Sequence, residues 1–134
     1  MAAIKSHTDL HQSKVLAKIL PLESADMHYH YDSDFDELES IPTITEEDDH
    51  FVLFPKDVRC WSLAALLNVL PNSENISTNL SKGGYIISTI EYTNSWFVDY
   101  EDETNGLNNC VTSADNPIDA CVDMIEKLYE LNLL

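Results

Sequence analysis

The stretch that decides the fold lies near the C-terminus: Asp115-Asn-Pro-Ile-Asp-Ala-Cys-Val-Asp-Met-Ile-Glu-Lys-Leu-Tyr-Glu-Leu131. Asp115 or Asn116 can cap a helix here, and Pro117 suits the first helical position, where its missing amide loses no hydrogen bond. Apolar residues recur at steps of three and four and form one wide stripe: Ile118, Cys121, Val122, Ile125, Leu128 and Tyr129. The sequence therefore predicts a helix over 115–131 that must bury this stripe against another element.

Two further helices are predicted from the same spacing. Residues 62–70 place leucines at steps of three and four behind Ser62, a plausible cap, and Pro71 stops the helix. Residues 6–20 form a short helix capped by Ser6 or Thr8 and ended by Pro21.

The strands are predicted between these helices. Tyr85–Tyr92 is rich in β-branched and aromatic residues, 93–95 is a turn, and Trp96–Tyr100 returns as the partner strand. Cys110–Thr112 is a third short strand, and the Asn- and Ser-rich residues 72–84 are a loop by composition. The fold class is therefore α+β, with a small antiparallel sheet of two or three strands packed against two or three helices.

The length of 134 residues fits one domain over 1–134, with an acidic, irregular segment at about 22–57. That segment holds 12 of the 24 acidic residues and one basic residue, Lys56, and its apolar residues show no sustained period. Within it, the apolar run 51–54 is predicted to be a strand or a loop anchored into the core.

The formal net charge of −17 limits the class of partner. Such a surface repels nucleic acids and anionic lipids and attracts basic proteins. We therefore expect no direct nucleic-acid binding and a basic protein partner. The acidic face predicted for it consists of Asp32, Asp34, Asp36, Glu37, Glu46, Glu47, Asp48, Asp49, Asp99, Glu101, Asp102 and Glu103. The competing interpretation is a set of solvated loops that serve solubility.

Three features of the sequence predict the cellular setting. No window of about 18 apolar residues is present, so we expect no membrane span. The first residues lack the pattern of a secretory signal. The cysteines, Cys60, Cys110 and Cys121, are odd in number and lack metal spacing, which favours reduced thiols in a cytoplasm.

Three stretches carry a resemblance to known proteins. They are Gln12-Ser-Lys14 with Leu20-Pro-Leu-Glu-Ser-Ala-Asp-Met27, then Cys60-Trp-Ser-Leu-Ala-Ala-Leu-Leu-Asn-Val-Leu-Pro71, and Asp115–Leu128. Together they resemble a group of small uncharacterised proteins from phages, prophages and mobile elements of gut anaerobic bacteria. The resemblance implies an accessory protein acting in the cytoplasm of a host bacterium and transfers no activity.

A metal site is one hypothesis for the segment His28-Tyr-His-Tyr-Asp-Ser-Asp-Phe-Asp-Glu37. Alternate residues of a strand point the same way, so His28 and His30 could bind one transition metal together with Asp32. A calcium loop fails here, because it needs Gly and Glu where Glu37 and Thr43 stand. The competing interpretation is a polar surface segment with a tyrosine packed inward.

Two other constellations are candidate sites. Tyr85, Tyr92 and Trp96 beside Lys82 form a candidate ligand pocket for a nucleobase, although they suit a core equally well. Cys60, at a helix start, is a candidate thiol nucleophile that His50 would have to approach in space.

The leading functional hypothesis is a non-enzymatic accessory protein that binds and inhibits or sequesters a host component. Its most concrete form is counter-defence, either as an acidic decoy of a nucleic-acid-binding protein or as a sponge for a small signalling nucleotide. The alternatives are a structural or assembly protein of the element and a small metal-dependent hydrolase. No Walker loop, dinucleotide glycine pattern, serine elbow or zinc-finger spacing is present, so we expect no cofactor. The oligomeric state stays open, and a homo-oligomer is compatible with the sequence.

Overall fold

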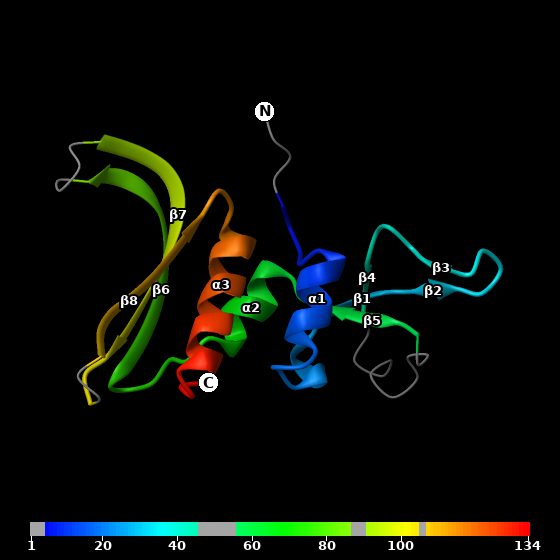
Figure 1. Cartoon of the computed structure of the whole chain (residues 1–134), viewed down its shortest axis with the longest axis horizontal. Helices are drawn as coiled ribbons and strands as arrows, with labels where there is room; N and C mark the ends of the chain where they lie inside the picture. The colour runs from blue at the N-terminus through cyan, green and yellow to red at the C-terminus, as the bar shows by residue number, and fades with distance from the viewer. Residues whose placement is uncertain (1–4, 46–55, 87–90, 105–106) are drawn as a thin grey trace. The chain divides into compact units, whose positions relative to one another are not determined.

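The computed structural model describes residues 5–45, 56–86, 91–104 and 107–134 of the chain (Figure 1). The chain divides into two compact units. One contains Ser6–Val69, and the other contains Lys5 with Leu70–Leu134. The fold is α+β, as predicted, with three helices and small antiparallel sheets. The prediction of a single domain remains a prediction, and each unit is described by itself.

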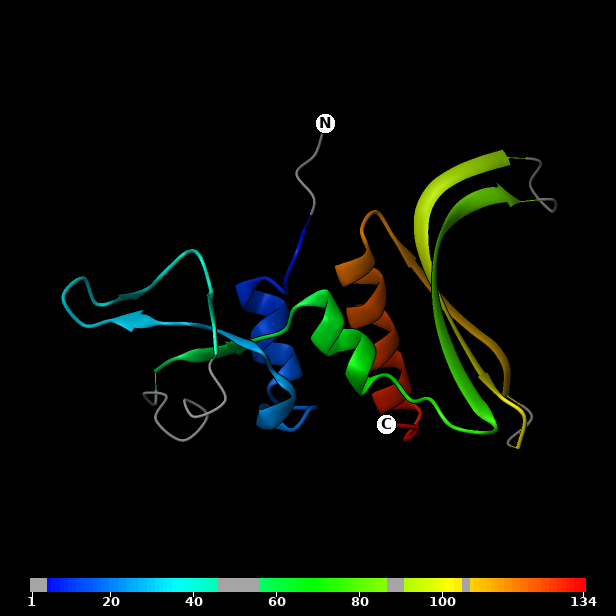
Figure 2. The ribbon, with the colours of Figure 1, turned by 180° about the vertical axis from the view of Figure 1, so that it is seen from behind.

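The larger sheet belongs to the Leu70–Leu134 unit and has the order β6-β7-β8. Its strands are β6 (Ile76–Ile86), β7 (Glu91–Asp102) and β8 (Leu107–Ala114), all antiparallel. The register shifts between Lys82 and Gly84, and Gly83 there has φ 36°, a left-handed value that glycine adopts without a Cβ clash. Figures 1 and 2 show that both long strands are bent, with their middle nearest α3 and their ends turned away from it.

The helix α3 (Pro117–Glu130) covers this sheet and contacts β7 and β8. Asn116 is its cap and accepts the Asp119 amide at 2.8 Å, and Pro117 follows as predicted. The predicted stripe is buried except for Tyr129, which is 51% exposed. On β7, which α3 contacts, Val98 and Tyr100 share one face and are buried as the alternation requires. This apolar contact stabilises the unit.

Three predictions about this sheet are wrong. The strand predicted over Tyr85–Tyr92 is divided between the end of β6 and the start of β7, where Tyr85 pairs with Tyr92. The loop predicted over 72–84 ends at residue 75, because β6 begins at Ile76 and pairs with β7, where Ile76 lies opposite Asp102. The turn predicted at 93–95 lies inside β7, where Trp96 pairs with both Lys82 and Ala114. The predicted third strand at 110–112 is present and extends over Leu107–Ala114.

The Ser6–Val69 unit begins with α1 (Leu10–Leu16), which is shorter than the predicted helix over 6–20. Neither Ser6 nor Thr8 is its cap. Asp9 accepts the Gln12 amide at 2.8 Å while the Gln12 side chain accepts the Asp9 amide at 3.0 Å, so the two form a capping box.

The described part of the segment 22–57 contains several short regular elements. It contains the 3₁₀ turn η1 (Leu22–Ser24) and the strands β1 (Met27–Tyr29), β2 (Tyr31–Asp32), β3 (Glu37–Leu38) and β4 (Thr43–Ile44). Together with β5 (Val58–Cys60), two of these strands form a sheet of order β4-β1-β5, and β2 and β3 form a hairpin. The apolar run predicted at 51–54 lies outside the described residues.

The core of this unit forms where its first and last segments meet. Thr8 and Trp61 are both fully buried, and the Thr8 amide donates to the Trp61 carbonyl at 2.9 Å. The Trp61 amide in turn donates to Thr8 Oγ1 at 3.1 Å. The helix α2 (Leu63–Val69) follows and contacts η1. As predicted, Ser62 caps it, because its hydroxyl oxygen accepts the Ala65 amide at 3.2 Å.

Candidate functional site

Strand pairing brings together three side chains that can ligate a metal: His28, His30 and Asp57. In the β1–β5 ladder His28 lies opposite Arg59 and Tyr29 opposite Val58, which places the next residue, His30, beside Asp57. One ligand atom from each of the three side chains lies within 4.8 Å of the other two. The prediction that His28 and His30 act together therefore has a geometric basis.

Hydrogen bonds hold these three side chains in place. Asp57 Oδ1 accepts the Tyr31 amide at 2.8 Å and lies 3.3 Å from His30 Nδ1. The Asp57 side chain is only 2% exposed, whereas that of His30 is 38% exposed. His28 Nδ1 lies 2.7 Å from the Thr45 hydroxyl oxygen in a buried contact. The Asp57 side chain and His28 are thus largely buried, and His30 is half-buried.

Asp32, the third ligand predicted from the sequence, is not part of this cluster. Its carboxylate accepts the Asp34 amide at 2.9 Å within the turn of the β2–β3 hairpin. The sequence interpretation missed Asp57 because it did not predict β5. Val58-Arg-Cys60 is too short to show a period, and only its pairing with β1 identifies it as a strand.

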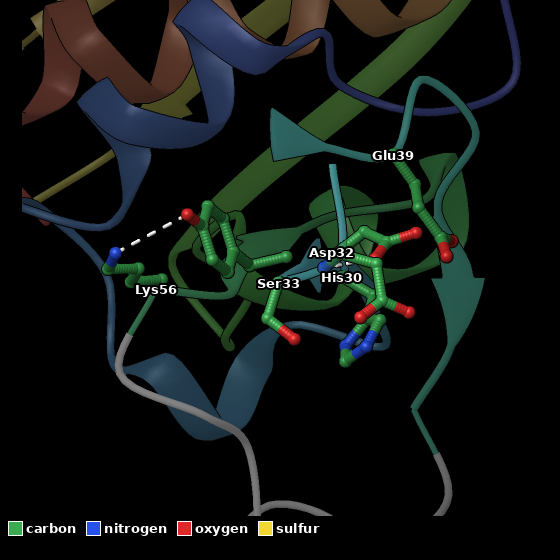
Figure 3. A pocket seen from close by; sticks show the side chains of 7 residues that line it. His30, Asp32, Ser33, Glu39 and Lys56 are labelled. Atoms are coloured by element: carbon green, nitrogen blue, oxygen red, sulfur yellow. Dashed lines mark hydrogen bonds between the residues drawn. The ribbon is translucent and has the colours of Figure 1, made fainter. Parts of the chain in front are cut away.

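A hollow of about 660 Å³ lies beside the cluster. Its lining residues are His30, Tyr31, Asp32, Ser33, Asp34, Glu39 and Lys56. Figure 3 shows Asp32 and Glu39 near His30, with Lys56 across the tyrosine ring. Lys56 Nζ lies 4.5 Å from the centroid of the Tyr31 ring and 3.4 Å from its hydroxyl oxygen. The hollow is therefore acidic on the His30 side and carries one cation opposite.

The next feature is the acidic hairpin, which we define as residues 31–39. Its exposed carboxylates are Asp34, Asp36, Glu37 and Glu39, and Asp32 is half-buried. Phe35 at the tip is 74% exposed. Asp36 has φ 52°, a left-handed conformation that aspartate tolerates in tight turns, and the Tyr31 hydroxyl donates to its carboxylate. The hairpin thus presents an apolar ring among five carboxylates.

The remaining residues of the predicted acidic face are divided. Glu46, Glu47, Asp48 and Asp49 lie outside the described residues, and Asp99, Glu101 and Glu103 are half-buried or exposed along β7 and just after it. Asp102 is only 1% exposed. It accepts the Thr104 amide at 2.9 Å and the Thr104 hydroxyl at 2.6 Å, so it closes a turn inside the protein. Asp102 therefore does not belong to a surface.

The candidate ligand pocket on the sheet is only partly described. Lys82 and Trp96 are paired in register, and Lys82 Nζ lies 5.8 Å from the Trp96 ring centroid. Tyr85 and Tyr92 are also paired in register, but their side chains lie outside the described part of the chain.

The three thiols are buried. Burial raises the pKa of the Cys60 thiol, against the lowering that its hydrogen bonds with Thr8 and Ser13 provide. Burial also raises the pKa of the Cys121 thiol to about 11. The hypothesis of an activated Cys60 is wrong, because a fully buried thiol with a raised pKa is a poor nucleophile. His50, its proposed base, lies outside the described residues.

Within the described ranges, no helix is both long and apolar enough to cross a membrane. Comparison of the chain with protein-family models, with curated proteins and with solved structures gave no match, so its own chemistry must carry any assignment.

Proposed function

We propose that this protein is a non-enzymatic accessory protein of a phage or mobile element that binds a basic, nucleic-acid-binding host protein as an acidic decoy. The context of a phage or mobile element is inferred from the sequence resemblance described above and is itself part of the proposal. The net charge of −17 supports a basic partner, because attraction between opposite charges accelerates the encounter of two proteins. The same negative charge repels nucleic acids.

The observation that carries the proposal is the acidic hairpin. Five carboxylates occur between residues 32 and 39, and no basic residue lies among them. Asp34 and Asp36 lie in the turn between β2 and β3, and Glu37 and Glu39 follow directly, so the hairpin concentrates four exposed negative charges that a basic groove could bind. Charge alone would act weakly at physiological salt, where the Debye length is about 8 Å.

Phe35 gives the hairpin a second means of binding. Phe35 is 74% exposed, so its ring is accessible to a partner. Aromatic residues at the centre of an interface often dominate its binding energy, while charges around them set the rate of encounter. A partner with an apolar pocket inside a basic groove would therefore satisfy both features.

The experiment is affinity capture from a host extract, identification of the retained protein, and titration of that purified protein at several salt concentrations. The hairpin variant Asp34→Asn/Glu37→Gln removes two charges, and Phe35→Ala removes the aromatic ring. The matched control, Glu101→Gln/Glu103→Gln, removes two exposed charges from the sheet unit.

We expect binding that weakens with salt, competes with a DNA duplex, and falls at least tenfold in the hairpin variant and in Phe35→Ala. The control should fall less than threefold. Equal losses in the hairpin variant and the control would show that only total charge matters, and binding that DNA does not displace would refute the decoy.

A further inference from the structure

We propose that His28, His30 and Asp57 form a binding site for one zinc ion. These residues lie at the end of β1 and just before β5, outside the acidic hairpin, so the inference does not depend on the proposed binding of a basic protein. Two imidazoles and a carboxylate form a donor set that zinc accepts, and catalytic zinc sites commonly have three protein ligands and one open position.

The distances suit this ion. Zinc bonds of about 2.1 Å at tetrahedral angles place neighbouring ligand atoms about 3.4 Å apart. His30 Nδ1 and Asp57 Oδ1 are 3.3 Å apart, so this pair already has the spacing of two ligands. The ligand atoms of all three residues lie within 4.8 Å of one another. Small side-chain rotations that shorten the longest of these spacings by up to about 1.4 Å would bring it to the tetrahedral value.

The supporting contacts also match those of a metal centre. Metal-binding histidines usually hydrogen-bond through the second ring nitrogen, which fixes the tautomer. When His28 Nδ1–H donates to the Thr45 hydroxyl at 2.7 Å, the lone pair of Nε2 is available to the metal. The Tyr31 amide at 2.8 Å likewise orients the Asp57 carboxylate.

The ion would keep one side open to solvent. His30 is half-buried and is the most exposed member of the cluster, and it also lines the hollow with Asp32 and Glu39 (Figure 3). A water molecule can therefore take the fourth position. The two carboxylates there add negative charge near the ion without being among the three ligands.

The test is zinc titration of the full, untagged chain after chelator treatment, followed by calorimetry and by competition with a chromogenic chelator. We expect one zinc per chain. Metal affinity should fall at least tenfold in His30→Gln and in Asp57→Asn, whose amide oxygen can still accept the Tyr31 amide. The control His11→Gln removes an exposed histidine of α1 in the same unit and should leave affinity unchanged.

A further control separates this site from the acidic hairpin. Asp32→Asn should keep zinc affinity within threefold, because Asp32 lies outside the cluster. The circular dichroism spectrum of each variant reports its fold, and His30→Gln should keep it because this side chain is the most exposed of the three ligands. Absence of zinc binding in the wild type, an equal loss in His11→Gln, or a larger loss in Asp32→Asn than in Asp57→Asn would overturn the proposal.

Discussion

Replacing Thr8 by valine should destabilise the Ser6–Val69 unit by about 2–6 kcal/mol, although the two side chains have nearly the same shape. The Thr8 hydroxyl is fully buried and bonds at 2.8 Å to the hydroxyl of Ser13, which is also buried. It also accepts the Trp61 amide at 3.1 Å. Valine fills the same space but leaves the Trp61 amide and the Ser13 hydroxyl without this partner.

The magnitude follows from counting those two groups. A buried donor or acceptor that loses its partner costs about 1–3 kcal/mol, and the loss of two gives the stated range. The Thr8 backbone bonds with Trp61 and with the Tyr29 hydroxyl remain in the variant. The effect should therefore appear as a lower urea midpoint with an unchanged slope.

Urea unfolding followed by fluorescence is the assay. A Trp96→Phe background leaves Trp61 as the single tryptophan reporter, and it lies in the affected unit. Thr43→Val, at an exposed strand position, is the isosteric control and should stay within about 0.5 kcal/mol. Adding Ser13→Ala to Thr8→Val removes one orphaned group, so the double variant should be about 1 kcal/mol more stable than the sum of the single effects predicts. A loss below 1 kcal/mol for Thr8→Val would refute the reasoning.

Three further predictions concern local features of the chain. Asn116→Ala should cost about 1 kcal/mol in thermal or urea unfolding, because it removes the α3 cap, whereas Asp115→Ala, next to it and exposed, should change stability little. Asp9→Ala should cost a similar amount in the other unit by removing the capping box, and an unchanged midpoint would show that this helix end is already frayed. Burial raises the pKa of Cys121 from its ordinary value of 9.0 to about 11. The contribution of this neutral thiol to the free energy of unfolding is therefore fully present below pH 9 and is lost as the pH rises through 11. Alkylation of Cys121 at pH 8, read by mass spectrometry, should therefore be about 100-fold slower than that of a free thiol, and comparable rates would contradict its burial.

The helices were the most predictable part of the fold. The residues that set α3 are local: a cap, a proline and a stripe with one period. The start of β6 was missed because Ile76-Ser-Thr-Asn-Leu-Ser-Lys82 has the composition of a loop, and pairing with β7 makes it a strand. Thr93-Asn-Ser95 was misread as a turn for the same reason. Long-range pairing overrides composition in both cases.

The candidate site was predictable only within one strand. The alternation His28-Tyr-His30 indicates two side chains on one face. Asp57 joins them across a ladder, and strands of two or three residues leave no period from which that ladder could be inferred. The exposure of Phe35 was likewise invisible to composition, because an aromatic residue in an acidic stretch can equally well pack inward.

The pairing of Thr8 with Trp61 also has a kinetic consequence. These residues are 53 positions apart in the chain, and closing such a loop costs about 1.5 kcal/mol more entropy than closing one of ten residues. Folding of this unit should therefore be slow for its size, because its first stabilising contacts are distant in sequence. During synthesis Thr8 and Leu16, which are buried in the folded protein, stay exposed until residue 61 has left the ribosome. Exposed apolar surface of this kind is prone to aggregation and is bound by chaperones.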